Sequence, residues 1–201
     1  MTQIASTPAK TWPITLGAEG MAAAQFARCG FDVMAQAGRD KPWYDLVVTR
    51  AGNLLKVAVK ASEDGQWSLT QGYTRRPAEA CGSKLDCHAS IDRWLASYGS
   101  RTVCCLVQFD QVALSEMPRI YLAFPWEIAD RMREAVERVG LCALLERYTW
   151  TAPDGSRRIE SLPSSWAFSE SRLDELQQMS APGFAIPTKP HPAARVIAIS
   201  A

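Results

Sequence analysis

Apolar and polar residues follow two different spacings along this chain, and together they predict helices that alternate with short strands. Apolar positions three to four residues apart are typical of one helical face, whereas short alternating or continuous apolar runs are typical of strands. We expect, in chain order, a helix over 17–29, strands over 31–35, 43–49 and 54–61, a short strand over 66–69, a helix over 89–98, strands over 101–109 and 119–124, a helix over 126–139, strands over 148–150 and 158–159, and a helix over 171–178.

Glycine and proline mark where several of these elements begin and end. Gly30 follows the first helix and stops it, and Pro125 suits the first turn of the helix over 126–139. Residues 50–53 (RAGN) separate two apolar runs and predict a hairpin turn. The strands on either side of that turn are therefore expected to be antiparallel neighbours.

The order of elements predicts an α/β fold with a mixed central sheet flanked by helices. We expect one domain over residues 16–180. Residues 1–15 contain few periodic apolar positions and predict a flexible N-terminal tail. Residues 181–201 turn to proline, alanine and isolated apolar residues, and predict an extended C-terminal tail.

Composition and charge say more about the cellular compartment of the protein than about its function. The 201 residues include 22 Lys and Arg against 21 Asp and Glu, so a nucleic-acid-binding surface would have to concentrate positive charge locally. No apolar stretch approaches the roughly 18 residues of a membrane span, and the first ten residues lack a secretory pattern. Adjacent Cys104 and Cys105 suit buried thiols better than disulfides. We expect a reduced, cytoplasmic setting.

Asp45 and Lys60 are the strongest candidates for chemistry. Asp45 lies in the expected strand over 43–49, and Lys60 lies near the end of the expected strand over 54–61. If these strands pair, the carboxylate and the ammonium meet at one edge of the sheet. A carboxylate that binds a divalent cation, with a lysine beside it, suits metal-assisted hydrolysis of a phosphodiester. Mg²⁺, or Mn²⁺, is the expected cofactor.

Three segments together resemble the PD-(D/E)XK nuclease superfamily: Glu19 on the first helix, Asp45 in a strand, and residues 57–60 (VAVK) in the next strand. The resemblance covers roughly residues 15–135 and is greatest to the homing-endonuclease and Holliday-junction-resolvase branches. It implies a restriction-endonuclease-like mixed sheet flanked by helices. It also implies that Asp45, Lys60 and Glu19 are catalytic, with Asp45 and Glu19 as metal ligands.

Position 58 departs from the superfamily pattern, in which an acid or a glutamine stands two residues before the lysine. Ala58 has no atom that can bind a metal, although strand alternation puts it on the same face as Lys60. Three alternatives are open. Glu19 could replace the missing acid, Glu63 or Asp64 could approach from beyond the strand, or the site could be catalytically silent.

Basic residues near the expected hairpin are candidates for contacts with DNA phosphates. They are Lys56, Arg75, Arg76 and Lys84. An ordinary solvated loop explains Arg75 and Arg76 equally well, and each of the proposed catalytic residues also has an ordinary structural role open to it. The joint order of Glu19, Asp45 and Lys60 is what favours a site.

Two other groups of residues carry weaker indications. Cys81, Cys87 and His88 have side chains that suit zinc, but their spacing matches no usual zinc motif and no fourth ligand is evident. Trp43 and Trp67 lie near the proposed site, where they could stack on a base, although packing in the core explains them more simply.

The sequence therefore predicts a Mg²⁺-dependent endodeoxyribonuclease that acts on duplex or branched DNA. A homodimer is the default, because a duplex has two strands to cut. The alternative is an inactive nuclease-fold protein that binds DNA or a protein partner, as an inhibitor or immunity factor does. Substrate shape, sequence preference and pathway are left open by the sequence.

Overall fold

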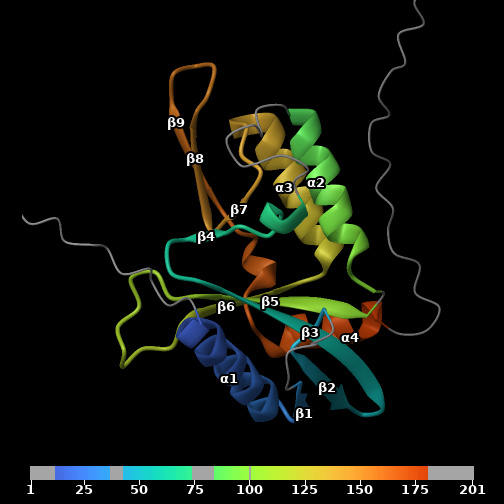
Figure 1. The fold of residues 1–201 in the computed structure, drawn as a ribbon. Helices are drawn as coiled ribbons and strands as arrows, with labels where there is room; N and C mark the ends of the chain where they lie inside the picture. The colour runs from blue at the N-terminus through green and yellow to red at the C-terminus, as the bar shows by residue number, and fades with distance from the viewer. Residues whose placement is uncertain (1–11, 37–42, 74–83, 100, 181–201) are drawn as a thin grey trace, which may run out of the picture.

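A five-stranded mixed sheet forms the centre of the protein (Figure 1). The computed structural model describes residues 12–36, 43–73, 84–99 and 101–180. The elements are α1 (Trp12–Arg28), β1 (Asp32–Ala35), β2 (Leu46–Arg50), β3 (Asn53–Ser62), β4 (Gln66–Trp67), the 3-10 helix η1 (Gln71–Tyr73), α2 (Lys84–Ala96), β5 (Thr102–Gln108), β6 (Arg119–Ala123), α3 (Pro125–Val139), β7 (Leu144–Leu145), β8 (Arg147–Thr151), β9 (Arg157–Ser161), the 3-10 helix η3 (Ser164–Trp166) and α4 (Glu170–Met179).

The central sheet has the strand order β1-β2-β3-β5-β6. β1 pairs antiparallel with β2 and β2 pairs antiparallel with β3, whereas β5 is parallel to β3, and β6 returns antiparallel to β5. A parallel neighbour needs a crossover, and the chain segment that contains α2 provides it. The expected α/β class, a mixed sheet flanked by helices, is confirmed.

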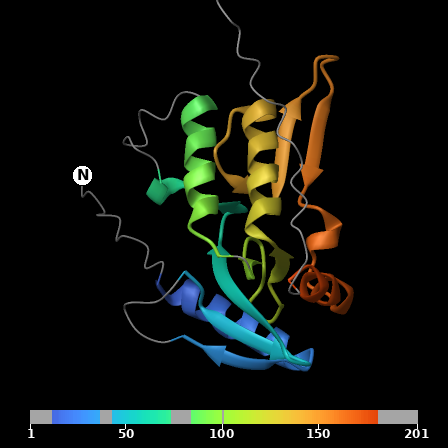
Figure 2. The same ribbon diagram turned by 90° about the vertical axis from the view of Figure 1, so that its right-hand side faces the viewer.

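Two apolar cores lie on opposite faces of this sheet, because successive side chains of a strand point to opposite faces. α1 and α4 cover one face, where Val57 and Val59 of β3 pack against Phe26. α2 and α3 lie side by side over the other face, where Ala58 and Cys104 belong to the second core (Figure 2). None of the helices in the described ranges has the length and apolar character of a membrane span.

Helix α1 begins earlier than the sequence predicts. The helix includes Trp12 to Thr15, which we expected to belong to a tail. Proline at position 13 is compatible with this start, because the first turn of a helix needs no hydrogen bond from its amide nitrogen. Helix α2 likewise begins at Lys84 instead of residue 89. The remainder of the expected N-terminal tail, the expected C-terminal tail and most of the irregular segment before α2 lie outside the described residues.

Two expectations about strands are wrong in detail. β2 begins at Leu46, so Asp45 immediately precedes the strand instead of lying within it. The segment 66–69 does not extend the β2–β3 hairpin, because its strand β4 pairs with β7 in a separate two-stranded sheet. The hairpin turn itself is confirmed, with Ala51 and Gly52 at φ 50° and 79° between the paired residues Arg50 and Asn53.

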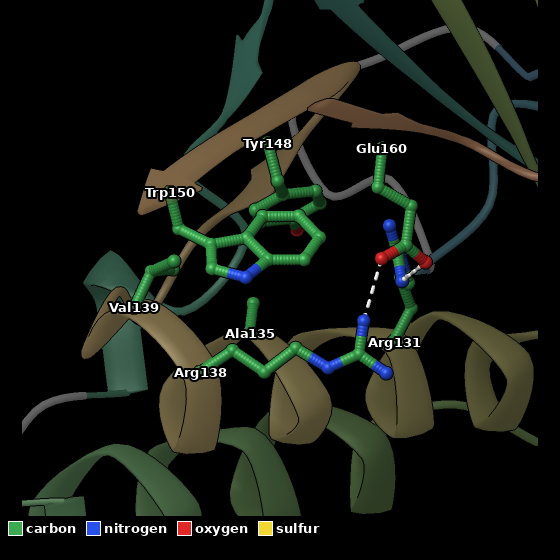
Figure 3. A pocket seen from close by; sticks show the side chains of 7 residues that line it. All are labelled: Arg131, Ala135, Arg138, Val139, Tyr148, Trp150 and Glu160. Atoms are coloured by element: carbon green, nitrogen blue, oxygen red, sulfur yellow. Dashed lines mark hydrogen bonds and ion pairs between the residues drawn. The ribbon is translucent and has the colours of Figure 1, made fainter. Parts of the chain in front are cut away.

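Strands β8 and β9 form a separate hairpin that projects beside α3 (Figures 1 and 2). Glu160 of β9 accepts hydrogen bonds of 2.5 Å from both Arg131 and Arg138 of α3. The guanidinium groups of these arginines lie over the rings of Tyr148 and Trp150, respectively (Figure 3). The cavity between these side chains measures about 10 Å³, room for roughly one water molecule, so this contact anchors the hairpin and leaves no space for a ligand.

Candidate active site

Hydrogen bonds to three neighbouring residues fix Asp45 immediately before the first residue of β2. Its amide donates to the Val57 carbonyl at 2.8 Å, and its carbonyl accepts from the Gln36 amide at 2.8 Å. The carboxylate oxygen Oδ2 accepts from the Val59 amide at 2.8 Å. The backbone of β3 therefore orients the Asp45 carboxylate directly.

Lys60 lies on the part of β3 that continues beyond its pairing with β2, which ends at Val57 opposite Leu46. Strand alternation places it on the same face of the sheet as Ala58, toward α2. Its carbonyl accepts a hydrogen bond from the Trp67 indole nitrogen at 3.0 Å, which fixes the backbone at this point. The residue lines an open cleft of about 390 Å³.

The charges of Asp45 and Lys60 both affect the pKa of the buried Cys104 thiol. Cys104 is the β5 partner of Ala58. Burial raises the pKa of this thiol to about 12, the positive charge of Lys60 and a hydrogen bond with Tyr98 oppose the rise, and the negative charge of Asp45 adds to it. The charges of Asp45 and Lys60 thus both reach this one thiol, with opposite effects on its pKa.

Glu19 is a half-buried residue in the middle of α1. It follows Thr15 by one helical turn, and Thr15 lines the same cleft as Lys60. Ala22 and Phe26, one and two turns further along, are buried against the sheet. Glu19 itself does not line the cleft.

Among the described residues that line the cleft, no acid takes the place of Ala58, which is 0% exposed. Glu63 is exposed, and Asp64 is held in the turn after β3, where its Oδ1 accepts from the Gln66 amide at 3.0 Å. Neither residue lines the cleft, and Asp45 does not line it either. Of the acids considered from the sequence, Glu19 stays the candidate for a second ligand, because it lies one helical turn from Thr15, which lines the cleft.

Zinc receives no support from the part of the chain that the structure describes. No group of three or more His, Cys, Asp or Glu side chains there could hold a metal ion. Cys81 lies outside the described residues. The Nε2 atom of His88 is 2.9 Å from a carboxylate oxygen of Glu137 on α3, an ordinary ion-pair geometry when the imidazole is protonated.

The expected phosphate-binding residues are only partly described. Lys56 is exposed on the same face of β3 as Lys60, and its Nζ lies 5.0 Å from the centre of the Tyr44 ring. Arg75 and Arg76 lie outside the described residues. Lys84 is the first residue of α2, and its side chain is also outside the described part.

Aromatic residues that sequence analysis did not connect with Lys60 form much of the cleft. Tyr73, Trp94 and Tyr98 line it together with Trp43 and Trp67. Burial is the main cause of the raised pKa of Tyr98, and the charge of Asp45 contributes to it. Trp94 lies in the last turns of α2 and Tyr98 just after its end, and only the crossover brings this part of the chain to Lys60.

The thiols beneath the site should be unreactive in the folded protein. Cys104 and Cys105 are both 0% exposed, and burial raises the pKa of each, so almost no thiolate forms at about pH 8. We expect maleimide labelling to modify the partly exposed Cys29 and Cys142 first and to reach Cys104 and Cys105 only in denaturant, as measured by peptide mass spectrometry. Native labelling of Cys104 as fast as Cys29 would contradict this arrangement.

Comparison of the chain with protein-family models and with curated protein sequences gives no significant match.

Proposed function

We propose that this protein is a metal-dependent DNA endonuclease of the PD-(D/E)XK type, which hydrolyses phosphodiesters in duplex or branched DNA. One observation carries the proposal: the Asp45 carboxylate accepts a hydrogen bond from the amide of Val59, which lines the same open cleft as the next residue of β3, Lys60. A carboxylate and an ammonium that converge at a cleft suit the hydrolysis of a charged ester.

A restriction-endonuclease-like fold is part of this proposal. A helix, three antiparallel strands, a second helix and a strand parallel to the third follow one another along the chain. This order agrees with the resemblance of Glu19, Asp45 and Lys60 to the superfamily's motif. A homodimer is the natural assembly for cutting both strands of a duplex, and we include it in the proposal.

Asp45 and Glu19 would hold the metal ion, Mg²⁺ or Mn²⁺. The carboxylate oxygens that they offer are the donors that Mg²⁺ prefers, and this ion commonly binds through one or two carboxylates while it keeps several waters. When bound, the ion would stabilise negative charge on the phosphate and promote ionisation of a water molecule. The hydrogen bond from the Val59 amide holds the Asp45 carboxylate in its orientation throughout.

Lys60 would bind a phosphate oxygen and stabilise the charge that develops there during hydrolysis. The hydrogen bond from Trp67 to its carbonyl keeps the backbone in place, so the ammonium needs little reorganisation. Lys56, on the same strand and face, would bind a neighbouring phosphate and contribute to affinity instead of chemistry.

Supercoiled and branched DNA should be cut in the presence of Mg²⁺ or Mn²⁺ and left intact in EDTA, with activity returning when the metal is restored. We expect Lys60→Ala to lower kcat by roughly 100-fold, because it removes charge stabilisation at the reacting phosphate. Lys56→Ala is the matched control and should raise KM at higher salt with kcat nearly unchanged. A Lys60→Ala protein with normal kcat would contradict the proposed role.

A second function, a catalytically silent protein of the same fold that binds DNA or a protein partner, is favoured by the buried Ala58. The described residues contain no cluster of three metal-binding side chains, so at most two carboxylates would hold the ion. In the same assay, a silent protein would bind DNA without cutting it under any metal. Activity gained by Ala58→Glu would then identify a nuclease that has lost its second acid.

A further inference from the structure

The cleft beside Lys60 contains one tryptophan whose exposure packing does not explain. Trp67 is 2% exposed and Trp94 1% exposed, so both belong to the core beneath the cleft. Trp43 is 65% exposed on the rim of the same cleft. A large apolar ring left in water at the mouth of a cleft is a feature of binding surfaces.

Tyr73 provides a fixed partner for Trp43. The centres of their rings are 6.3 Å apart and their planes are inclined by 39°. The Tyr73 hydroxyl donates to Ser97 at 2.9 Å, and its carbonyl accepts from Arg93 at 2.5 Å, so α2 holds this tyrosine in position. Trp43 therefore rests at an angle against a rigid neighbour, with most of its surface exposed.

The remaining lining of the cleft suits a ligand that has both a flat ring and negative charge. Lys60 supplies a cation, and Thr15 and Ser68 supply hydroxyl groups. A volume of about 390 Å³ lies within the range of pockets that bind small organic groups. Aromatic rings beside a lysine are the elements with which proteins bind single-stranded nucleic acid, by stacking on bases and pairing with phosphates.

We propose that this cleft binds an unpaired nucleobase of the DNA substrate, which stacks on Trp43 while an adjoining phosphate contacts Lys60. The inference rests on the proposed function and specifies its substrate: DNA that is single-stranded or unpaired at the site of cleavage, as at a branch or a bulge. A paired base in a duplex has both ring faces covered by its neighbours and cannot stack on Trp43 unless it leaves the helix.

The test is fluorescence anisotropy in EDTA, which separates binding from cleavage. A labelled single-stranded oligonucleotide, the matching duplex and a duplex with a bulge serve as probes. We expect Trp43→Ala to weaken binding of the single strand and the bulge by about tenfold and that of the duplex by less than about twofold. Trp43→Phe should retain most of the affinity because it keeps a stacking surface. Leu114→Ala is the matched control, an exposed apolar residue in the loop between β5 and β6.

The outcomes separate this inference from the proposed function. Equal binding of the single strand by Trp43→Ala and by the unmodified protein would overturn the inference, even if metal-dependent cleavage is observed. Equal losses for all three probes would also overturn it, because they would indicate a general contact with the backbone. Selective loss without any cleavage by the unmodified protein would support the base-binding cleft and reject the endonuclease.

Discussion

Asp45→Ala is expected to reduce metal-dependent DNA cleavage by roughly 10³-fold, because it removes a proposed metal ligand. Affinity for DNA should change little when measured in EDTA, since Asp45 contributes no positive charge to the interface. The substitution also removes the acceptor of the Val59 amide, so the folded state should be checked by its thermal transition. The measurement is the initial rate of nicking of supercoiled DNA at saturating Mg²⁺.

Asp64→Ala provides the matched control for this effect. Asp64 is also an acidic residue close to β3, and its carboxylate accepts a hydrogen bond from the backbone amide of Gln66. Asp45 differs from it in accepting a hydrogen bond from Val59, a residue that lines the cleft. We expect full cleavage by Asp64→Ala with a slightly lower thermal midpoint. If both Asp45→Ala and Lys60→Ala still cleave DNA, the active site must lie elsewhere on the protein.

Arg172→Met is expected to lower the free energy of unfolding by about 3–5 kcal/mol, because it leaves the carboxylate of Glu127 without its buried counter-charge. Arg172 is almost fully buried on α4. Its guanidinium donates to Glu127, to Glu175 and to the carbonyl of Leu122. This one side chain thus connects α4 to α3 and to the edge strand β6. Equilibrium denaturation in urea measures the loss.

The pH dependence of that loss distinguishes a missing charge from a missing contact. Burial raises the pKa of Glu127, and the charge of Arg172 opposes the rise, so the pKa should climb further in Arg172→Met. A carboxyl whose pKa is higher in the folded state stabilises the fold below its unfolded pKa, and this stabilisation is lost as pH rises through the folded pKa. The deficit of Arg172→Met should therefore be smaller at about pH 5 than at about pH 7.

Two further variants make the test specific. Glu127→Gln combined with Arg172→Met should recover part of the stability at neutral pH, because no buried charge is then left unpaired. Arg158→Met removes an arginine of an exposed pair with Asp154 and should have little effect. A pH-independent deficit in Arg172→Met would show that lost packing outweighs the lost ion pair.

The elements of this fold follow from local sequence patterns to a large extent. The apolar stripe of α3 predicts the buried residues Ile128, Met132 and Val136, and Pro125 sets the start of the helix. The hairpin between β2 and β3 follows from its turn sequence. These features are predictable because residues close in the chain determine them. The start of α1 was missed because the first turn, with proline at position 13, carries little apolar periodicity.

The cleft could not be predicted, since it depends on which distant strands are neighbours. Asp45 and Lys60 could be related to each other through one hairpin turn. Placing Tyr98 and Cys104 beside them requires the parallel pairing of β3 with β5, which no local pattern specifies. For the same reason, Trp43 and Trp67 were indistinguishable in the sequence, although one lies at the rim of the cleft and the other in the core.

The parallel pair of β3 and β5 also has a consequence for the order of folding. It joins residues 46 positions apart, such as Ser62 and Gln108, whose side chains share a hydrogen bond of 3.0 Å. Contacts between residues so distant in the chain form slowly compared with a hairpin. The β2–β3 hairpin, next to Asp45 and including Lys60, can therefore form early. The residues of α2 that line the cleft take their positions only when β5 pairs with β3. In refolding experiments the acid and the lysine would come together before the cleft exists, and recovery of DNA binding would follow the slower, long-range step.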